Sequence, residues 1–214
     1  VLHHLGVLLL SKGERAKALS LFRRAAFLRP DLVASQINLS QLLGEAGDYE
    51  AALKAAETAL LYLPESPRAR LAVANALRGV QRYRDAEQGY QKLLEPNAKT
   101  PEGTSKDALY NLAILYLDAE LPGIELEARL ELAIKQFTSY LDRFKPPADE
   151  AQALNGYVLQ AKRQIESEKK RKERDEKRRV KDAEKKALSA QSASAPSASS
   201  LPSSAPTQAS SLPK

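Results

Sequence analysis

Residues 39–64 read LSQLLGEAGDYEAALKAAETALLYLP. Apolar residues recur at helical spacing on both sides of the polar segment EAGDY, which predicts two helices joined by a short turn. The final proline has no N–H to donate and clashes with the preceding helical turn, so it ends the second helix. The stretch is therefore a helical hairpin, and neither helix can bury its apolar face alone.

The hairpin recurs along the chain with a period of 34 residues. Ala18, Ala52 and Ala86 are separated by that step, and so are Pro30 and Pro64. The same step relates three further sets of small or apolar residues: Leu5, Leu39 and Val73; Gly6, Ser40 and Ala74; Leu9, Leu43 and Leu77. Stacking successive hairpins buries their apolar faces against one another, so the period predicts a solenoid.

The pattern resembles the tetratricopeptide repeat (TPR) family. The best copy carries the matching small, apolar and aromatic residues at Leu39, Ser40, Leu43, Gly47, Tyr49, Ala52, Ala59 and Pro64. The resemblance covers about residues 1–144, in three regular copies and one irregular copy. We therefore predict an all-α TPR solenoid of about four helix pairs.

The irregular copy carries an insertion. Helices are expected at 107–118 and 132–144, after a loop at 97–106, and about eight residues too many lie within 118–126. Its candidate functional residues are the acidic and turn-forming ones, Asp118, Glu120, Pro122, Gly123 and Glu125.

Two interpretations of this insertion stay open. It is either an acidic loop that engages a basic partner, or a long hairpin connection whose acidic residues lie near a helix N-terminus, where negative charge is favoured. The second interpretation is preferred. A calcium loop is disfavoured because neither the ligand spacing nor the glycine matches an EF-hand.

Composition argues against an enzyme. The chain has no cysteine, so thiol catalysis and cysteine-ligated zinc are excluded. Its two histidines, His3 and His4, are adjacent and would diverge by about 100° on a helix. There is no glycine-rich phosphate loop. We predict no catalytic residues, no metal and no cofactor.

The resemblance instead implies a concave groove lined by the first helix of each pair. The groove positions that we predict to bind a partner are polar or aromatic: Asn38, Gln41, Arg68, Asn75, Arg78, Tyr110 and Asn111. Amide side chains can both donate to and accept from a peptide backbone, and arginine can bind carboxylates with two hydrogen bonds. The first-copy positions that chaperone-binding TPRs fill with Lys and Asn hold His3 and Val7, so chaperone C-termini are not predicted. The expected function is a non-catalytic scaffold for a peptide or partner protein.

Three regions are expected along the chain. Residues 1–165 form the TPR solenoid and a capping helix that starts near Asp149, and 166–188 form a charged helical extension. The Ser/Ala/Pro-rich tail at 189–214 is predicted to be disordered. Residues 162–186 carry 13 basic and 7 acidic residues, while the whole chain has a net charge of +6. The alternative function is therefore a basic arm that binds nucleic acid or an anionic surface, although interleaved acids and missing aromatics disfavour specific nucleic-acid readout.

Location is predicted from a second resemblance. The sequence YNLAILYLDAELPG at 110–123, with the charged helix after it, is similar to TPR lipoproteins of bacterial gliding-motility machinery. That similarity implies a role in a cell-envelope assembly, with a lipid anchor on a segment upstream of Val1; the cytoplasm is the alternative. No apolar run approaches the 18 residues of a membrane span.

Overall fold

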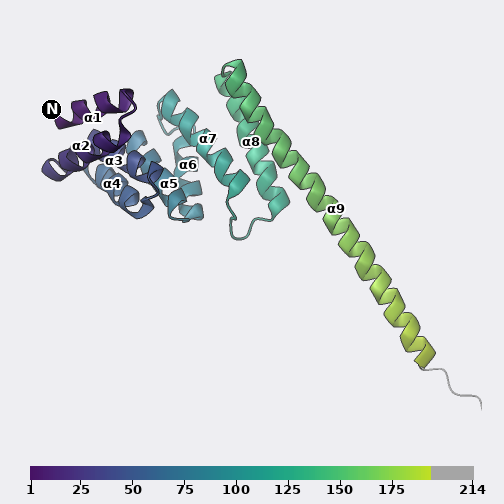
Figure 1. The fold of residues 1–214 in the computed structure, drawn as a ribbon. Helices are drawn as coiled ribbons and strands as arrows, with labels where there is room; N and C mark the ends of the chain where they lie inside the picture. Colours follow the sequence, from purple (N-terminus) through teal and green to yellow (C-terminus); the bar gives the residue numbers. More distant parts are fainter. Residues whose placement is uncertain (194–214) are drawn as a thin grey trace, which may run out of the picture. The chain divides into compact units, whose positions relative to one another are not determined.

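The computed structural model describes residues 1–193, and every regular element among them is an α-helix (Figure 1). In chain order the helices are α1 (Leu2–Ser11), α2 (Arg15–Leu28), α3 (Val33–Glu45), α4 (Tyr49–Tyr62), α5 (Pro67–Gly79), α6 (Tyr83–Leu94), α7 (Glu102–Asp118), α8 (Leu126–Phe144) and α9 (Ala148–Ala193).

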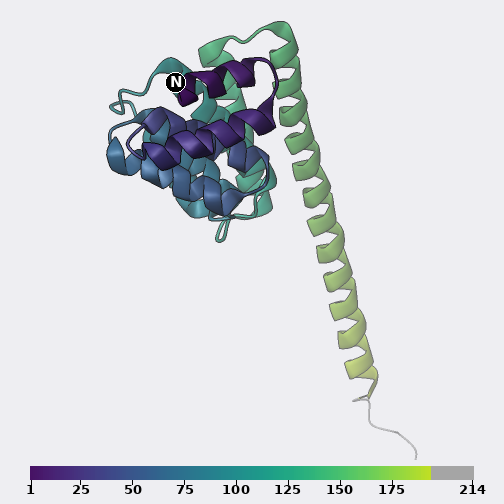
Figure 2. The same ribbon diagram turned by 60° about the vertical axis from the view of Figure 1, so that its left-hand side comes forward.

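The first eight helices form four hairpins that stack in chain order, as Figure 1 and Figure 2 show. The helices of each pair contact each other, and each second helix also contacts the first helix of the next pair. The first helices α3, α5 and α7 additionally contact one another in turn. This arrangement confirms the predicted all-α TPR solenoid of four helix pairs.

Small residues allow the paired helices to approach closely. A Cβ atom added to Gly6 on α1 would lie 2.8 Å from the ring of Phe22 on α2. In the third pair, a Cβ added to Gly89 would lie 2.9 Å from the Cβ of Ala74. One equivalent position of the four second helices is fully buried in every pair, and three of its four residues are aromatic: Phe22, Ala56, Tyr90 and Phe137. The residues that recur every 34 positions thus include those at which the paired helices come into close contact.

The fourth pair differs from its predicted bounds. The loop expected at 97–106 is shorter than predicted because α7 begins at Glu102, five residues before the predicted start. Pro101 precedes the first turn of α7, where its missing backbone N–H leaves no helical hydrogen bond unmade. Thr104 and Ser105 are buried, so the extra helical turn places these two residues in the packed interior. Helix α8 likewise begins at Leu126 rather than at 132. The insertion between them falls at 119–125, inside the predicted 118–126.

Contacts divide the chain into two units, 1–168 and 169–214. In the first unit, the start of α9 packs against the fourth pair: Leu154 and Ala161 are buried, and the ring of Tyr157 stacks on Phe137 with centroids 5.4 Å apart. Helix α9 continues to Ala193, so it includes the first five residues of the tail predicted to be disordered. Residues 194–214, the rest of that tail, lie outside the described residues.

The burial of Phe137 gives a stability prediction. Phe137→Ala should lower the free energy of unfolding by about 3–5 kcal/mol, because it leaves a cavity where α8 meets α9. Phe27→Ala is the matched control, since the Phe27 side chain is 83% exposed, and should change stability by less than about 0.5 kcal/mol. Urea unfolding followed by circular dichroism measures both. Equal effects of the two variants would show that this contact does not hold α9 on the solenoid.

Candidate functional site

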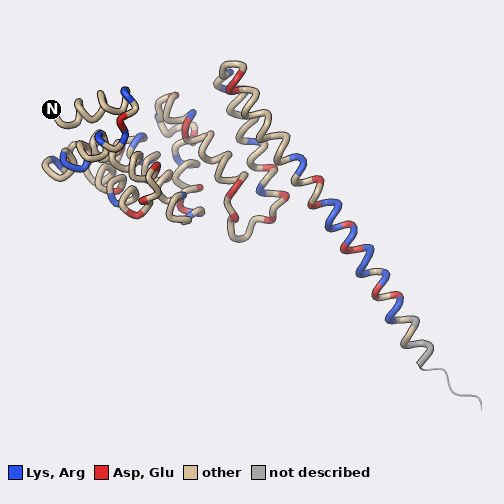
Figure 3. Tube along the Cα trace, viewed as in Figure 1, with Lys and Arg blue, Asp and Glu red and all other residues tan. Residues whose placement is uncertain are grey.

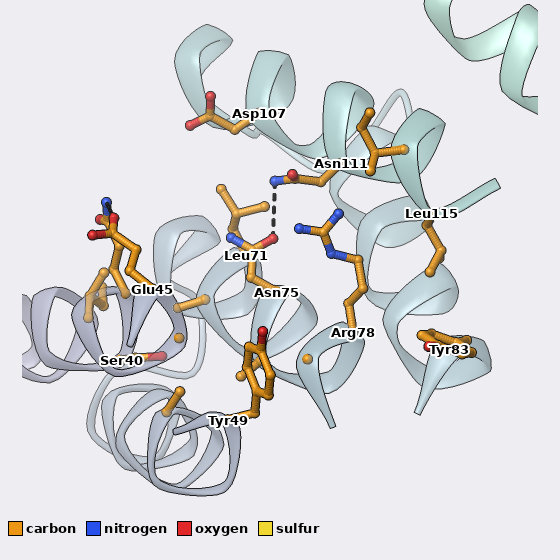
Figure 4. Close-up of a pocket in the computed structure, with 18 of the residues that line it drawn as sticks. Ser40, Glu45, Tyr49, Leu71, Asn75, Arg78, Tyr83, Asp107, Asn111 and Leu115 are labelled. Atoms are coloured by element: carbon orange, nitrogen blue, oxygen red, sulfur yellow. Dashed lines mark hydrogen bonds between the residues drawn. The ribbon is translucent and has the colours of Figure 1, made fainter. Parts of the chain in front are cut away.

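A groove runs across the first helices α3, α5 and α7. It encloses a cavity of about 750 Å³. Both polar and apolar side chains line its wall, among them Gln41, Glu45, Arg68, Leu71, Asn75, Arg78, Asp107, Asn111, Ile114 and Asp118. Figure 4 shows side chains from the three helices directed into this space. The first-helix faces therefore form the concave surface that the TPR resemblance implied.

Most of the predicted partner-binding residues meet at this cavity. Those that line it are Gln41, Arg68, Asn75, Arg78 and Asn111, together with Asp118 from the predicted insertion. Asn38 is half-buried and does not line the cavity. Tyr110 does not line it either, because its ring packs against Phe137 and Tyr140, with centroid distances of 6.5 and 6.3 Å. That any of these residues binds a partner stays a prediction.

The first pair contributes nothing to the cavity. His3 and Val7, which occupy the corresponding groove positions, are absent from its wall. The Nδ1 atom of His3 lies 3.0 Å from the Ser35 hydroxyl, and its ring packs near Phe22. Burial, followed by the neighbouring charge of His4, lowers the pKa of His3. His3 therefore takes part in the packing of the first helix pair against the second.

A fixed amide pair occupies the centre of the groove. The Asn75 side-chain oxygen accepts a hydrogen bond from the Asn111 amide nitrogen at 3.1 Å (Figure 4). The same oxygen accepts a second hydrogen bond from the Tyr90 hydroxyl at 2.8 Å. Tyr90 is fully buried, and burial raises its pKa, so its hydroxyl stays protonated and donates. The Asn75 amide nitrogen and the Asn111 oxygen have no hydrogen-bond partner within residues 1–193. The pair thus keeps free amide N–H donors and a free amide oxygen, so it can both donate to and accept from a peptide group.

Two arginines flank this pair on α5. Arg68 and Arg78 are ten residues apart, which corresponds to about 15 Å along a helix. Neither forms an ion pair or hydrogen bond within the described part of the chain. Partial burial raises the pKa of Asp107 on α7, while Lys106 and Arg68 oppose that shift. Glu45 on α3 is paired with Arg15, whereas Asp107 and Asp118 on α7 line the cavity beside the two arginines, so the groove presents charges of both signs.

Aromatic walls of the groove were missed by the sequence analysis. Tyr49 and Tyr83, the first residues of α4 and α6, line the cavity beside the first helices. The Tyr49 ring lies directly over Gly79, where a Cβ atom would overlap it, so glycine is required at this close approach. The two tyrosines are 34 residues apart, and that spacing was the available signal.

The insertion at 119–125 is held against the solenoid. Ala119 and Leu121 are buried, and the backbone oxygen of Pro122 accepts a hydrogen bond from Arg84 on α6. Arg84 also pairs with the buried Glu87 at 2.8 Å. Gly123 adopts φ +79°, a conformation that glycine reaches without strain. The segment is therefore an anchored connection between α7 and α8.

A second arginine secures the end of α7. Arg129 on α8 is buried and donates to the backbone oxygens of Tyr116 at 2.6 Å and Leu117 at 2.9 Å. Burial lowers the pKa of Arg129, and the charges of Asp118 and Glu120 act in the opposite direction. Asp118 at the end of α7 and Glu120 in the insertion thus stabilise a buried cation, which favours the long-connection interpretation. Glu120 and Glu125 remain solvent-exposed, and their role in partner binding stays a prediction.

Residues 1–193 contain neither a cluster suited to a metal ion nor a helix suited to a membrane span. Within residues 1–193, no three His, Asp or Glu side chains lie together in a way that could hold a metal ion. None of the helices in that range has both the length and the apolar character needed to cross a bilayer.

The tetratricopeptide repeat family model matches residues 43–105, which run from the end of α3 into α7. Comparison with curated protein sequences gives no match. The repeats in the matched stretch are those that build the centre of the groove. The family resemblance stated from the residues is therefore supported for this part of the chain.

Solved structures share the fold. A crystal structure of MamA protein is 16% identical with a TM-score of 0.54, covering 78% of this chain and 83% of its own. MamA residues 41 to the end, from Desulfovibrio magneticus RS-1, is 17% identical with a TM-score of 0.53, covering 69% and 76%. A tetratricopeptide repeat protein from Parabacteroides merdae ATCC 43184 is 22% identical with a TM-score of 0.53, covering 78% and 62%. These likenesses establish a TPR-type solenoid.

The buried tyrosines give a pH prediction. Burial raises the pKa of Tyr90 and also of Tyr116, whose hydroxyl donates to Glu87 at 2.6 Å. A folded-state pKa above the unfolded value contributes stability that is complete below about pH 10 and is lost as the pH rises beyond it, by roughly 1.4 kcal/mol per pH unit for each tyrosine. The Tyr90→Phe/Tyr116→Phe double variant should therefore lose about 2–3 kcal/mol less than the wild type between pH 10 and 11.

Urea unfolding at pH 8, 10 and 11 measures this difference. Tyr49→Phe/Tyr62→Phe is the control, because it also removes two tyrosine hydroxyls but from residues that are more than 40% exposed rather than buried. Parallel profiles for the wild type and the Tyr90/Tyr116 variant would contradict the prediction.

Proposed function

We propose that this protein is a non-catalytic scaffold that binds an extended segment of a partner protein in the groove of α3, α5 and α7. The central observation is the Asn75–Asn111 pair, which presents both amide donors and an amide acceptor between two arginines that lack ion pairs. The TPR-type fold supports the proposal, because such repeats typically mediate protein–protein interactions rather than catalysis.

The size and charge of the groove define its occupant. A cavity of about 750 Å³ holds a short peptide stretch rather than a folded domain. Extended chain advances about 3.3 Å per residue, so acidic side chains four to five residues apart would span the ~15 Å between Arg68 and Arg78. The peptide groups between them would lie over the amide pair. The expected ligand is an extended segment with two acidic residues at that spacing.

Photo-crosslinking tests where the partner binds. A photoreactive amino acid placed at Ile114 in the groove should capture a partner, whereas one at Leu61, which is 75% exposed on α4, should not. A third position at Glu120 reports whether the insertion also touches the partner. Cross-links from Leu61 with none from Ile114 would overturn the groove assignment.

A matched pair of variants then tests the chemistry. Arg78→Ala/Asn111→Ala should weaken binding of the captured partner about 10- to 100-fold, because a charge-assisted hydrogen bond contributes about 1.5–3 kcal/mol. Arg24→Ala/Gln88→Ala removes the same charge from exposed positions outside the cavity and should leave the affinity unchanged. Equal losses would mean that the net charge, not the groove, determines binding.

We further propose that the protein acts in a cell-envelope assembly, with a lipid-anchored location. This proposal rests only on the resemblance that the sequence of residues 110–123 and the charged helix bears to TPR lipoproteins of gliding-motility machinery; the alternative is the cytoplasm. Fractionation of cells that produce the full-length protein tests the location. We expect it with the envelope fraction and released by detergent, and recovery in the cytosolic fraction would contradict the proposal.

A further inference from the structure

The charged part of α9 has a preferred face. Residues 169–186 contain 11 basic and 5 acidic residues, and Figure 3 shows the two kinds alternating along the helix. Alternation along the sequence is not alternation around the helix, because each residue advances by about 100°. Basic and acidic residues that alternate in the sequence can therefore lie on different faces of the helix.

Seven of these cations fall within one arc of about 120°. They are Lys170, Arg171, Arg174, Lys177, Arg178, Lys181 and Lys185, called here the basic stripe. All seven are solvent-exposed, and no acidic residue of the segment lies within the arc. The basic stripe extends over the 16 residues from Lys170 to Lys185, or about 22 Å of helix.

The acidic residues stand on the other faces. Glu173 and Glu184 lie about 80–100° from the centre of the stripe on one flank, and Asp175 and Asp182 lie as far away on the other. Glu176 is nearly opposite the stripe. Both flanks of the helix are thus acidic while one face is purely basic.

We propose that the basic stripe docks this segment on the surface of a membrane that contains anionic lipids. A flat anionic surface meets only one face of a straight helix, so all seven cations can approach it together while both acidic flanks stay in water. Each Lys or Arg near such a surface strengthens binding about fivefold. Val180 is the only branched aliphatic residue of the segment, so the helix rests on the head groups without inserting.

The same layout disfavours nucleic acid. A helix of about 10–12 Å diameter fills a major groove about 12 Å wide, so the phosphates of a duplex would face both flanks. Glu173, Asp175, Asp182 and Glu184 would then repel them. Single-stranded nucleic acid is bound by stacking on aromatic side chains, and residues 169–186 contain none.

Vesicle binding by the full 214-residue chain tests the proposal. The chain should sediment with vesicles of 70% phosphatidylcholine and 30% phosphatidylserine, should remain in solution with pure phosphatidylcholine, and should be released as salt is raised from 0.05 to 0.5 M. The stripe variant Arg174→Gln/Lys177→Gln/Lys181→Gln should bind the anionic vesicles on the order of 100-fold more weakly.

The control is chosen to have the same composition. Lys172→Gln/Arg179→Gln/Lys186→Gln also replaces two lysines and one arginine, but these lie outside the arc, and it should lose less than about fivefold. Circular dichroism checks that both variants keep their helix content. Equal losses for the two variants, no binding of the wild type to anionic vesicles, or tighter binding to a 30-base-pair duplex than to vesicles at equal salt would each overturn the proposal.

Discussion

The close approach of the two helices in each pair is the constraint on which the rest of the structure depends. This contact requires a small residue wherever the opposite helix carries a large one. Gly6, for example, faces the ring of Phe22. In the third pair the small residues are Ala74 and Gly89, which meet beside the buried Tyr90. Because this contact repeats every 34 residues, it sets the spacing between pairs and places α3, α5 and α7 side by side.

The groove follows from that spacing, and the core shapes its chemistry. Tyr90 belongs to a second helix, is fully buried, and still reaches Asn75 on the first helix with its hydroxyl. The amide in the groove is therefore oriented by the same residue that fills the helix contact behind it. The surface around this pair can vary without affecting the fold, because Arg68 and Arg78 make no ion pair or hydrogen bond within residues 1–193. Packing thus fixes the frame of the site, while exposed residues set its charge.

Much of the fold could be predicted because repeat positions combine local helix signals with a fixed period. The turn residues, the terminal prolines and the buried alanines at Ala18, Ala52 and Ala86 were all visible in the sequence. The residues that face the groove were largely predictable for the same reason, since equivalent positions in successive repeats place their side chains on the same face. Asn38 and Tyr110 are the exceptions, because neither lines the cavity. The Tyr110 position faces the groove in a regular array, but the longer α7 and α8 surround its ring with Phe137 and Tyr140.

Contacts between distant, non-equivalent residues could not be predicted from the repeat. Arg84 on Pro122 and Arg129 on the last carbonyls of α7 anchor the insertion, yet neither arginine occupies a position that the repeat specifies. The exposed acidic residues of the insertion suggested a basic partner in the sequence, whereas the buried Arg129 accounts for part of their presence. In the charged segment, the linear order of Lys, Arg and Glu hid the separation of charges around the helix.

The central claim is that the amide pair between α5 and α7 meets the partner. Nuclear magnetic resonance of the side-chain amides of Asn75 and Asn111 tests it most directly, as a captured partner or its binding segment is titrated in. If the amide pair meets the partner, both resonances shift and saturate together with binding. Unchanged signals from both asparagines, with shifts confined to α2, α4 or α9, would contradict it.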